Sequence, residues 1–211
     1  MSITRKSGYE IKLMREAGRV VALVHAEMKK IVQPGVTTQY LNDVAFQIIK
    51  DNKCDPTFLG YNGFPATICA SVNEQIVHGF PSDRVLKDGD IISIDVGATY
   101  RGYVGDSAWT YPVGEISDDC KKLLETTEKA LFAGLANLKA GNLLEDVSGA
   151  IEDVAIANNY GIVRQYGGHG VGSKMHEEPF VFNYRVNSNV LLKSGMTIAI
   201  EHMLNLGVDD V

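Results

Sequence analysis

Two aspartates, Asp95 and Asp106, constrain the fold of this chain more than any other feature, because the sequence predicts them on the two arms of one β-hairpin. Residues 90–97 alternate apolar and polar side chains, and residues 103–110 are rich in aromatic and β-branched side chains, as strands are. Arg101-Gly102 is the expected turn. If the turn centres near Tyr100-Arg101, the two aspartates face each other directly, with their Cβ atoms about 4.5–5.5 Å apart.

Two carboxylates that face each other need a stabilising partner. Like charges in directly opposed positions destabilise a sheet, and an apolar strand face beside them raises the cost of keeping both ionised. A fold retains such a pair if the carboxylates share a proton or if a cation bridges them. Alternatively, the register slips by one residue and the two side chains point to opposite faces. The hairpin alone leaves these alternatives open.

Further oxygen and imidazole ligands recur along the chain. His169 lies in a Gly-Gly-His-Gly-Val-Gly stretch, and Glu201 follows the apolar run at residues 198–200. His78 and His176 supply two more imidazoles. Glycines flank His78 and His169 closely and His176 more loosely, and glycine allows the backbone to approach a ligand. Taken singly, each histidine is compatible with a structural role, and the glutamate with a strand end that reaches solvent.

These residues lie in sequence frames that resemble the methionine aminopeptidases of type I, members of the pita-bread metallopeptidase superfamily. The resemblance extends in the family's order over nearly the whole chain. The matching stretches are residues 68–79, 87–97, 105–106, 168–172, 176–179 and 195–201. The resemblance implies an α+β pita-bread fold, a pseudo-two-fold arrangement with a curved antiparallel sheet covered by helices.

The resemblance also implies a site for up to two divalent metal ions. Asp95 would hold one ion, Asp106 would bridge both, and His169 with Glu201 would hold the other. Carboxylates together with imidazole suit Co, Mn, Fe(II) or Zn better than Ca or Mg alone. Two such ions can clamp an attacking hydroxide and polarise the carbonyl of the bond that is cleaved.

Catalytic roles follow from the same resemblance. Glu201 matches the residue that shuttles the proton of the nucleophilic water, and His176 matches the one that steadies the substrate carbonyl and its oxyanion. His78 matches a residue near the scissile nitrogen, where it could guide the leaving amide. Two structural alternatives stay open: His78 as a turn residue, and His176 as a partner that orients His169.

A substrate slot for methionine is implied by four residues, Tyr61, Phe64, Cys69 and Met175, although core packing explains each of them equally well. An apolar, polarisable lining discriminates between side chains by about 1–3 kcal/mol per methylene. The expected reaction removes the initiator methionine from nascent chains whose second residue is small. The resemblance also makes the ribosome a candidate partner and a monomer the expected state.

The sequence departs from the family pattern in two places. A histidine, His202, follows Glu201 where the family has proline; it either adds a ligand or faces away along the strand. The chain also ends at Val211, before the family's last bridging glutamate. We therefore expect the metal held by His169, Glu201 and Asp106 to bind, and the second metal to bind weakly.

Two other functions remain open at this stage. A non-catalytic relative could keep the fold as a binding module for N-termini of nascent chains or for a protein partner. A proline-specific or creatine-cleaving member of the same superfamily is a more distant alternative, against which the sequence around Cys69 argues.

Composition fits a cytoplasmic enzyme of ordinary globular type. The 211 residues are 45% hydrophobic and 22% charged, within the range of a single domain, which we predict to span residues 1–211. The net charge of −6 argues against nucleic acid or an anionic membrane as partner. Three cysteines cannot all pair, and no apolar run reaches the length of a membrane span.

Helical periodicity predicts two helix pairs about 106 residues apart. The first helix spans residues 11–32, and a second begins after Thr37 or Thr38. The apolar side chains at helical spacing in the first helix are Leu13, Ala17, Val20, Val21, Val24 and Met28. The third spans residues 123–138, and the fourth carries apolar side chains from Val147 onward at the offsets seen in the second. Each pair precedes a strand-rich stretch, which indicates a weak internal duplication.

Overall fold

The computed structural model describes residues 2–211, which form a mixture of helices and antiparallel strands. The chain divides into two compact units. The N-terminal unit comprises Tyr9–Ser117 and Gly172–Met175, and the C-terminal unit comprises residues 2–8, Asp118–Val171 and His176–Val211. Whether they act as one catalytic domain over residues 1–211 stays a prediction.

Two helices pack against the sheet of the N-terminal unit. Helix α1 (Gly8–Ile31) and helix α2 (Thr38–Asp51) bury one apolar face each, at the positions that the periodicity predicts. The buried side chains of α1 are Leu13, Ala17, Val20, Val21, Val24 and Met28. Thr37 caps α2, because its side chain accepts a hydrogen bond from the Tyr40 amide, 3.1 Å away.

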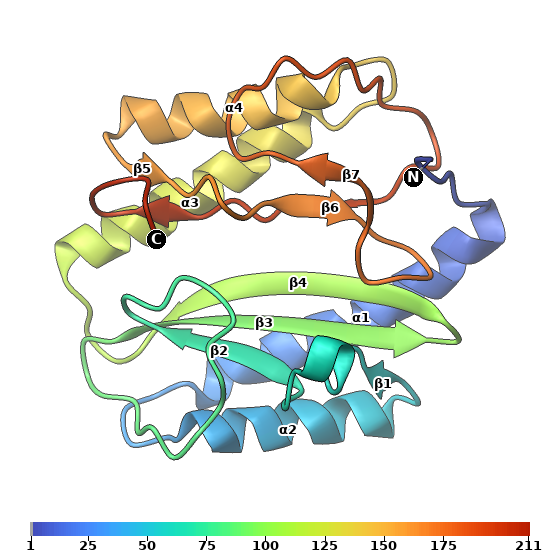
Figure 1. The fold of residues 1–211 in the computed structure, drawn as a ribbon. Coiled ribbons are helices and arrows are strands. Elements are labelled where there is room, and N and C mark those ends of the chain that lie inside the picture. The colour runs from blue at the N-terminus through green and yellow to red at the C-terminus, as the bar shows by residue number, and fades with distance from the viewer. Residues whose placement is uncertain (1) are drawn as a thin grey trace. The chain divides into compact units, whose positions relative to one another are not determined.

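The sheet of this unit consists of four antiparallel strands (Figure 1). Strand β3 (Ile91–Tyr100) lies between β2 (Ile68–Val72) and β4 (Tyr103–Pro112), and the short β1 (Asp55–Pro56) also pairs with β3. A 3-10 turn, η1 (Tyr61–Gly63), connects β1 to β2. All five residues of β2 are buried, so the centre of the sheet forms part of the core.

The register of the β3–β4 hairpin corrects the prediction that Asp95 faces Asp106. Asp95 pairs with Ala108, and Asp106 pairs with Gly97. The turn consists of Arg101 and Gly102, both with positive φ (48° and 82°), which is the type I′ geometry that suits a two-residue hairpin loop. This turn shifts the register by two residues rather than one, so both carboxylates stay on the same face.

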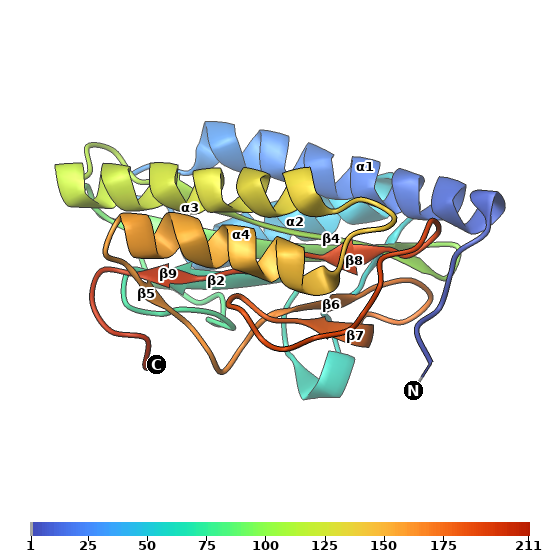
Figure 2. The ribbon, with the colours of Figure 1, turned by 90° about the horizontal axis from the view of Figure 1, so that it is seen from above.

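The C-terminal unit contains a helix pair and two small sheets. Helix α3 (Asp118–Asn137) packs against α4 (Leu144–Ala157), and Figure 2 shows the two side by side. Strand β6 (Gly168–Gly170) lies between β7 (Glu177–Val181) and β8 (Ile198–Ala199), whereas β5 (Gly161–Ile162) pairs with β9 (Leu204–Asn205). The apolar sides of α3 and α4 and residues such as Val181 and Leu192 form the core.

The helix boundaries differ from prediction mainly at α3, which begins five residues before residue 123. Asp118 and Asp119 occupy its first turn, where negative charge interacts favourably with the helix dipole. An apolar pattern does not detect such a polar start. Within residues 2–211, none of the helices combines the length and the apolar character needed to cross a membrane.

The internal duplication is confirmed, because each unit contains the same local features. These features correspond more closely than the sequence pattern indicates. Helices α2 and α4 have the same length of 14 residues and begin 106 positions apart. Isolated bridges join Thr37 to Val85 and Leu143 to Leu191, at the same offset. The backbone bond from Gly35 N to Leu86 O likewise recurs between residues 141 and 192. Each helix is therefore anchored to its unit by the same local hydrogen bonds.

Candidate metal centre

The N-terminal unit presents two carboxylates on one face of its sheet. Asp95 lies between Cys69 on β2 and Ala108 on β4, while Asp106 is diagonal to it, opposite Gly97. Diagonal neighbours of this kind are about 7–8 Å apart at Cα, within reach of shared ligands but without the direct repulsion of an opposed pair. This face can therefore offer two oxygen ligands in one direction.

His78 belongs to the same unit and has a left-handed backbone, with φ of 60°. Non-glycine residues adopt this conformation rarely, and such strain concentrates at functional sites. The next residue, Gly79, lies so close to β2 that an added Cβ would be 2.4 Å from the Ala70 carbonyl oxygen. Gly79 also accepts a hydrogen bond from the Ala70 amide. The backbone next to His78 is thus held against β2, the neighbour of the strand that carries Asp95, and His78 itself is exposed.

The four predicted slot residues all lie in the N-terminal unit. Cys69 is buried directly opposite Asp95, and Met175 is buried as well. Phe64 is half-buried, and its ring makes an edge contact with that of Phe80 at 5.3 Å. Tyr61 is exposed on the turn η1. The strand register places one of these four residues, Cys69, directly opposite Asp95.

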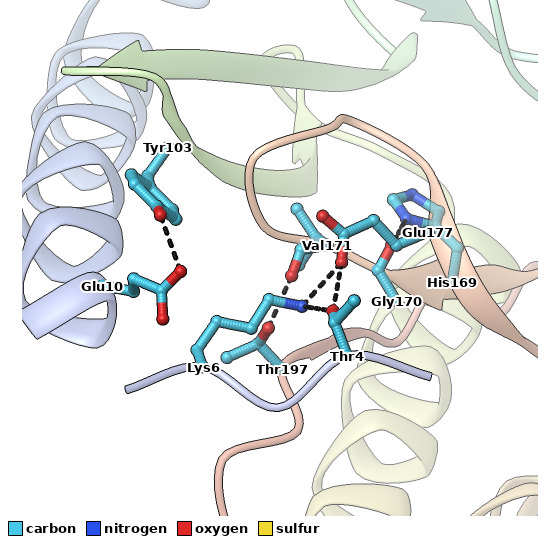
Figure 3. Close-up of polar contacts among 9 residues, drawn as sticks. All are labelled: Thr4, Lys6, Glu10, Tyr103, His169, Gly170, Val171, Glu177 and Thr197. Atoms are coloured by element: carbon cyan, nitrogen blue, oxygen red, sulfur yellow. Dashed lines mark hydrogen bonds and ion pairs between the residues drawn. The ribbon is translucent and has the colours of Figure 1, made fainter. Parts of the chain in front are cut away.

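In the C-terminal unit, His169 and Glu201 come together although they are 32 positions apart. The imidazole Nε2 lies 2.7 Å from the Glu201 Oε1. The other ring nitrogen, Nδ1, lies 2.8 Å from the Gly170 carbonyl oxygen (Figure 3). Because a carbonyl only accepts, Nδ1 carries a proton, and in the neutral ring Nε2 holds a lone pair directed at the carboxylate.

This arrangement fits a divalent cation. Two lone-pair atoms 2.7 Å apart need a cation between them, either a proton carried by one of the two groups or a metal ion that both atoms coordinate. A metal-binding histidine typically donates its other N–H to a backbone carbonyl, as His169 does to Gly170. Imidazole and carboxylate are common ligands of transition metals. His169 and Glu201 therefore form half of a donor set with its orienting hydrogen bond already in place.

His176 lies against His169, with 4.3 Å between the ring centroids. It is exposed and directly precedes β7, which pairs with β6 next to His169. Its position is compatible both with contact to a substrate and with a role in orienting His169, the two alternatives that the sequence left open. The C-terminal unit thus brings His169, His176 and Glu201 together.

His202 faces away from His169, His176 and Glu201. Of the two alternatives predicted from the sequence, an added ligand or a side chain that faces away, the structure shows the second. Its Nε2 donates to the Thr127 carbonyl of α3 at 2.8 Å, and the residue is half-buried. Burial lowers the pKa of His202 below its ordinary value, and the bond to Thr127 opposes this shift only in part. The histidine that replaces proline therefore attaches the segment after Glu201 to helix α3.

One buried cluster near the site was not predicted. Lys6 contacts Glu177 at 2.7 Å, and both also bond the Thr4 hydroxyl (Figure 3). The two charged residues are 171 positions apart, so no local pattern links them. The only signal in the sequence is the i, i+2 spacing of Thr4 and Lys6, which places both side chains on one side of an extended segment.

Comparisons with known proteins agree with this geometry. Residues 12–209 match the model of metallopeptidase family M24. Methionine aminopeptidase 1 of Bacillus subtilis is 53% identical over 96% of this chain, which covers 82% of that protein. The crystal structure of methionine aminopeptidase from Rickettsia prowazekii superimposes with a TM-score of 0.96 at 37% identity, covering 99% of this chain and 85% of that one.

A more distant relative shows the same fold. The Xaa-Pro dipeptidase from Bacillus anthracis superimposes with a TM-score of 0.82 at 24% identity, over 96% of this chain and 55% of that one. The chain belongs to the type I methionine aminopeptidases of metallopeptidase family M24. The predicted α+β pita-bread fold and the family resemblance are both confirmed.

Proposed function

We propose that this chain removes the initiator methionine from nascent polypeptides whose second residue is small, by metal-dependent hydrolysis of the first peptide bond. The observation that carries the proposal is the 2.7 Å approach of His169 Nε2 to Glu201 Oε1 in a chain of this family. It provides a cation site with a carboxylate that can also accept a proton.

In this proposal the N-terminal unit contributes Asp95 and Asp106, and the C-terminal unit contributes His169 and Glu201, to as many as two divalent cations. Cobalt, manganese, iron(II) and zinc all suit this donor set. When bound, the cations would supply positive charge that acidifies water and polarises the scissile carbonyl. The hydrogen bond from Nδ1 to the Gly170 carbonyl supports the role of His169.

The remaining roles belong to side chains of the protein. Glu201 accepts the proton of the attacking water and passes it on, His176 donates to the carbonyl oxygen as negative charge develops there, and His78 lies near the leaving nitrogen. The methionine side chain occupies a slot lined by four residues. These are Tyr61, Phe64, Cys69 and Met175.

The proposal includes the cellular setting. The protein would act as a monomer in the cytoplasm, on chains that emerge from the ribosome, without direct contact with nucleic acid or membrane. The net charge of −6 supports this last point, because anionic surfaces would repel the protein.

The test is hydrolysis of the peptide Met-Ala-Ser after metal has been stripped and Mn(II) or Co(II) titrated back. Release of methionine should depend on metal and should disappear in Glu201→Ala. A matched control, Glu125→Ala, makes the same change at an exposed position of α3 and should retain activity. Leu-Ala-Ser and Ala-Pro peptides should be poor substrates.

Two results would contradict the proposal. Equal activity in Glu201→Ala and wild type would remove the carboxylate from the reaction. A folded, metal-loaded wild type that binds Met-Ala-Ser without cleaving it would instead support the non-catalytic binding module.

A further inference from the structure

Residues Thr4–Lys6, here called the N-terminal strap, lie against the three-stranded sheet whose central strand, β6, carries His169. Lys6 is buried although it is a lysine, and its ammonium contacts the Glu177 carboxylate at 2.7 Å. The side chains of Lys6 and Glu177 are only 5% and 10% exposed. Lysine is almost never buried unless it is paired, so this contact has a specific structural purpose.

The polar groups of the cluster form a closed set (Figure 3). The Lys6 ammonium donates to the Thr4 hydroxyl at 2.6 Å and to Glu177 Oε2 at 2.7 Å. The Thr4 hydroxyl in turn donates to the same carboxylate oxygen at 2.6 Å. Two donors from one segment thus converge on a single oxygen of the Glu177 carboxylate, which restricts its position.

The strap also binds the other side of the sheet. The Lys6 amide donates to the Gly195 carbonyl at 2.6 Å, and Arg5 Nε donates to the Ser194 carbonyl at 2.8 Å. Residues 194–195 lie shortly before β8, separated from it by Met196 and Thr197, whereas Glu177 opens β7. The strap therefore contacts the first residue of β7 and the segment before β8, the two strands that flank β6.

Glu177 is the link between the strap and the site. It follows His176 in the chain and pairs across the sheet with Gly170, next to His169. The register of β6 and β7 shifts at this point, between His169 and Gly170, so the regular ladder is interrupted and fixes the strand less firmly there. An ion pair at this irregularity supplies the constraint that the ladder lacks.

We propose that Lys6 is a positioning residue of this site: by holding the Glu177 carboxylate it fixes the start of β7, and with it the imidazole of His176 beside His169. Only the kinetic effect of this positioning role rests on the proposed function. The placement of His176 can be measured separately.

The test compares Lys6→Met, which removes the charge at similar length, with Arg5→Met in the same strap, which loses its bond to Ser194 but leaves Glu177 paired. Lys6→Met should lower kcat on Met-Ala-Ser by about tenfold with little change in KM. This is less than the roughly 10²–10³-fold loss on deleting an oxyanion donor outright. Arg5→Met should stay within about twofold of wild type.

A spectroscopic readout isolates the position of His176 from activity. In metal-free, histidine-labelled protein the His176 ring signal, assigned by its loss in His176→Gln, should shift or broaden in Lys6→Met and remain unchanged in Arg5→Met. If wild type releases no methionine, the proposed function fails, while this spectrum still decides the positioning role.

A double variant guards against loss of the fold. Lys6→Met leaves a buried carboxylate without its counter-charge, so Lys6→Met/Glu177→Gln should recover part of the stability and part of the His176 signal. If Lys6→Met does not fold, the double variant replaces it in both assays, compared with Glu177→Gln alone. The positioning role is refuted if the lysine variant and Arg5→Met leave kcat and the His176 signal equally unchanged.

Discussion

A close approach between helix α1 and the sheet of the N-terminal unit should make Gly105→Ala one of the most damaging small substitutions in the chain. A Cβ at Gly105 on β4 would lie 2.4 Å from the Gly18 nitrogen and 2.6 Å from the Ala17 carbonyl carbon. Both atoms belong to the backbone of α1, so no side chain can rotate away. Helix or strand must move by about 1 Å to restore an ordinary contact.

The magnitude follows from this geometry. Overpacking a core costs about 1–3 kcal/mol, and rigid backbone on the far side places Gly105→Ala near the upper end. For a chain of this length, about 3 kcal/mol corresponds to a fall in Tm of about 6–12 °C. Because Asp106 follows directly, a displaced β4 should also weaken metal binding.

Gly18→Ala provides a matched control with the opposite sign. Within the described residues, no atom outside the local helix backbone and the adjoining residues lies within 4 Å of a Cβ built at Gly18. Alanine is preferred to glycine inside a helix by about 0.5–1 kcal/mol. The same methyl group should therefore stabilise the protein when it is placed on α1 and destabilise it when it is placed on β4.

The assay is urea unfolding followed by the fluorescence of Trp109, the only tryptophan in the chain, and by far-ultraviolet circular dichroism. Equal m-values would show that the comparison concerns stability. The reasoning is refuted if Gly105→Ala unfolds within about 0.5 kcal/mol of wild type, a change expected of an ordinary surface substitution.

Three further predictions concern capping, pH and metal. Thr37→Ala removes the cap of α2 and should cost about 1 kcal/mol in urea unfolding, whereas Thr37→Ser should cost much less. Burial lowers the pKa of His25 below that of the unfolded chain, so the unfolding free energy should fall as pH drops below about 6.5, and fall less in His25→Gln; equal slopes would contradict this. Mn(II) should raise the Tm of wild type, EDTA should reverse the rise, and His169→Ala should abolish it, as calorimetry can check.

Helices were the most predictable part of this fold, because their packing faces repeat locally. The six apolar positions assigned to the first helix are the six buried ones of α1. The start of α3 at Asp118 was missed, since it depends on charge near the helix dipole rather than on apolar spacing.

The hairpin shows where prediction from local pattern stops. The alternation of residues 90–97 predicts a strand and the face that Asp95 occupies, but register depends on the turn. Arg101 and Gly102 both take positive φ, and this choice moves Asp106 from direct opposition to a diagonal position. A shift of two residues keeps each side chain on the same face of the sheet. The prediction that both carboxylates share one face is therefore correct, although the predicted register is wrong.

A stronger signal of the duplication was available in the sequence. Residues 86–95 read Leu-Lys-Asp-Gly-Asp-Ile-Ile-Ser-Ile-Asp, and residues 192–201 read Leu-Lys-Ser-Gly-Met-Thr-Ile-Ala-Ile-Glu. The turns adopt the same geometry, since the amides of residues 90 and 196 each bond the carbonyl three positions earlier at 3.1 Å. The contact of Lys6 with Glu177 had no such signal, because it depends only on tertiary structure.

Asp95 and Glu201 occupy equivalent positions of this repeat, but the two side chains are held in place in different ways. Asp95 lies inside a continuous ten-residue strand that is paired on both sides, so the ladder fixes its direction. The corresponding stretch of the C-terminal unit breaks into β8 and β9, with Glu201 in the irregular segment between them. Its carboxylate is thus positioned by contacts, above all the one with His169. One of these two proposed ligands is therefore set by the sheet, and its counterpart depends on its contact with His169.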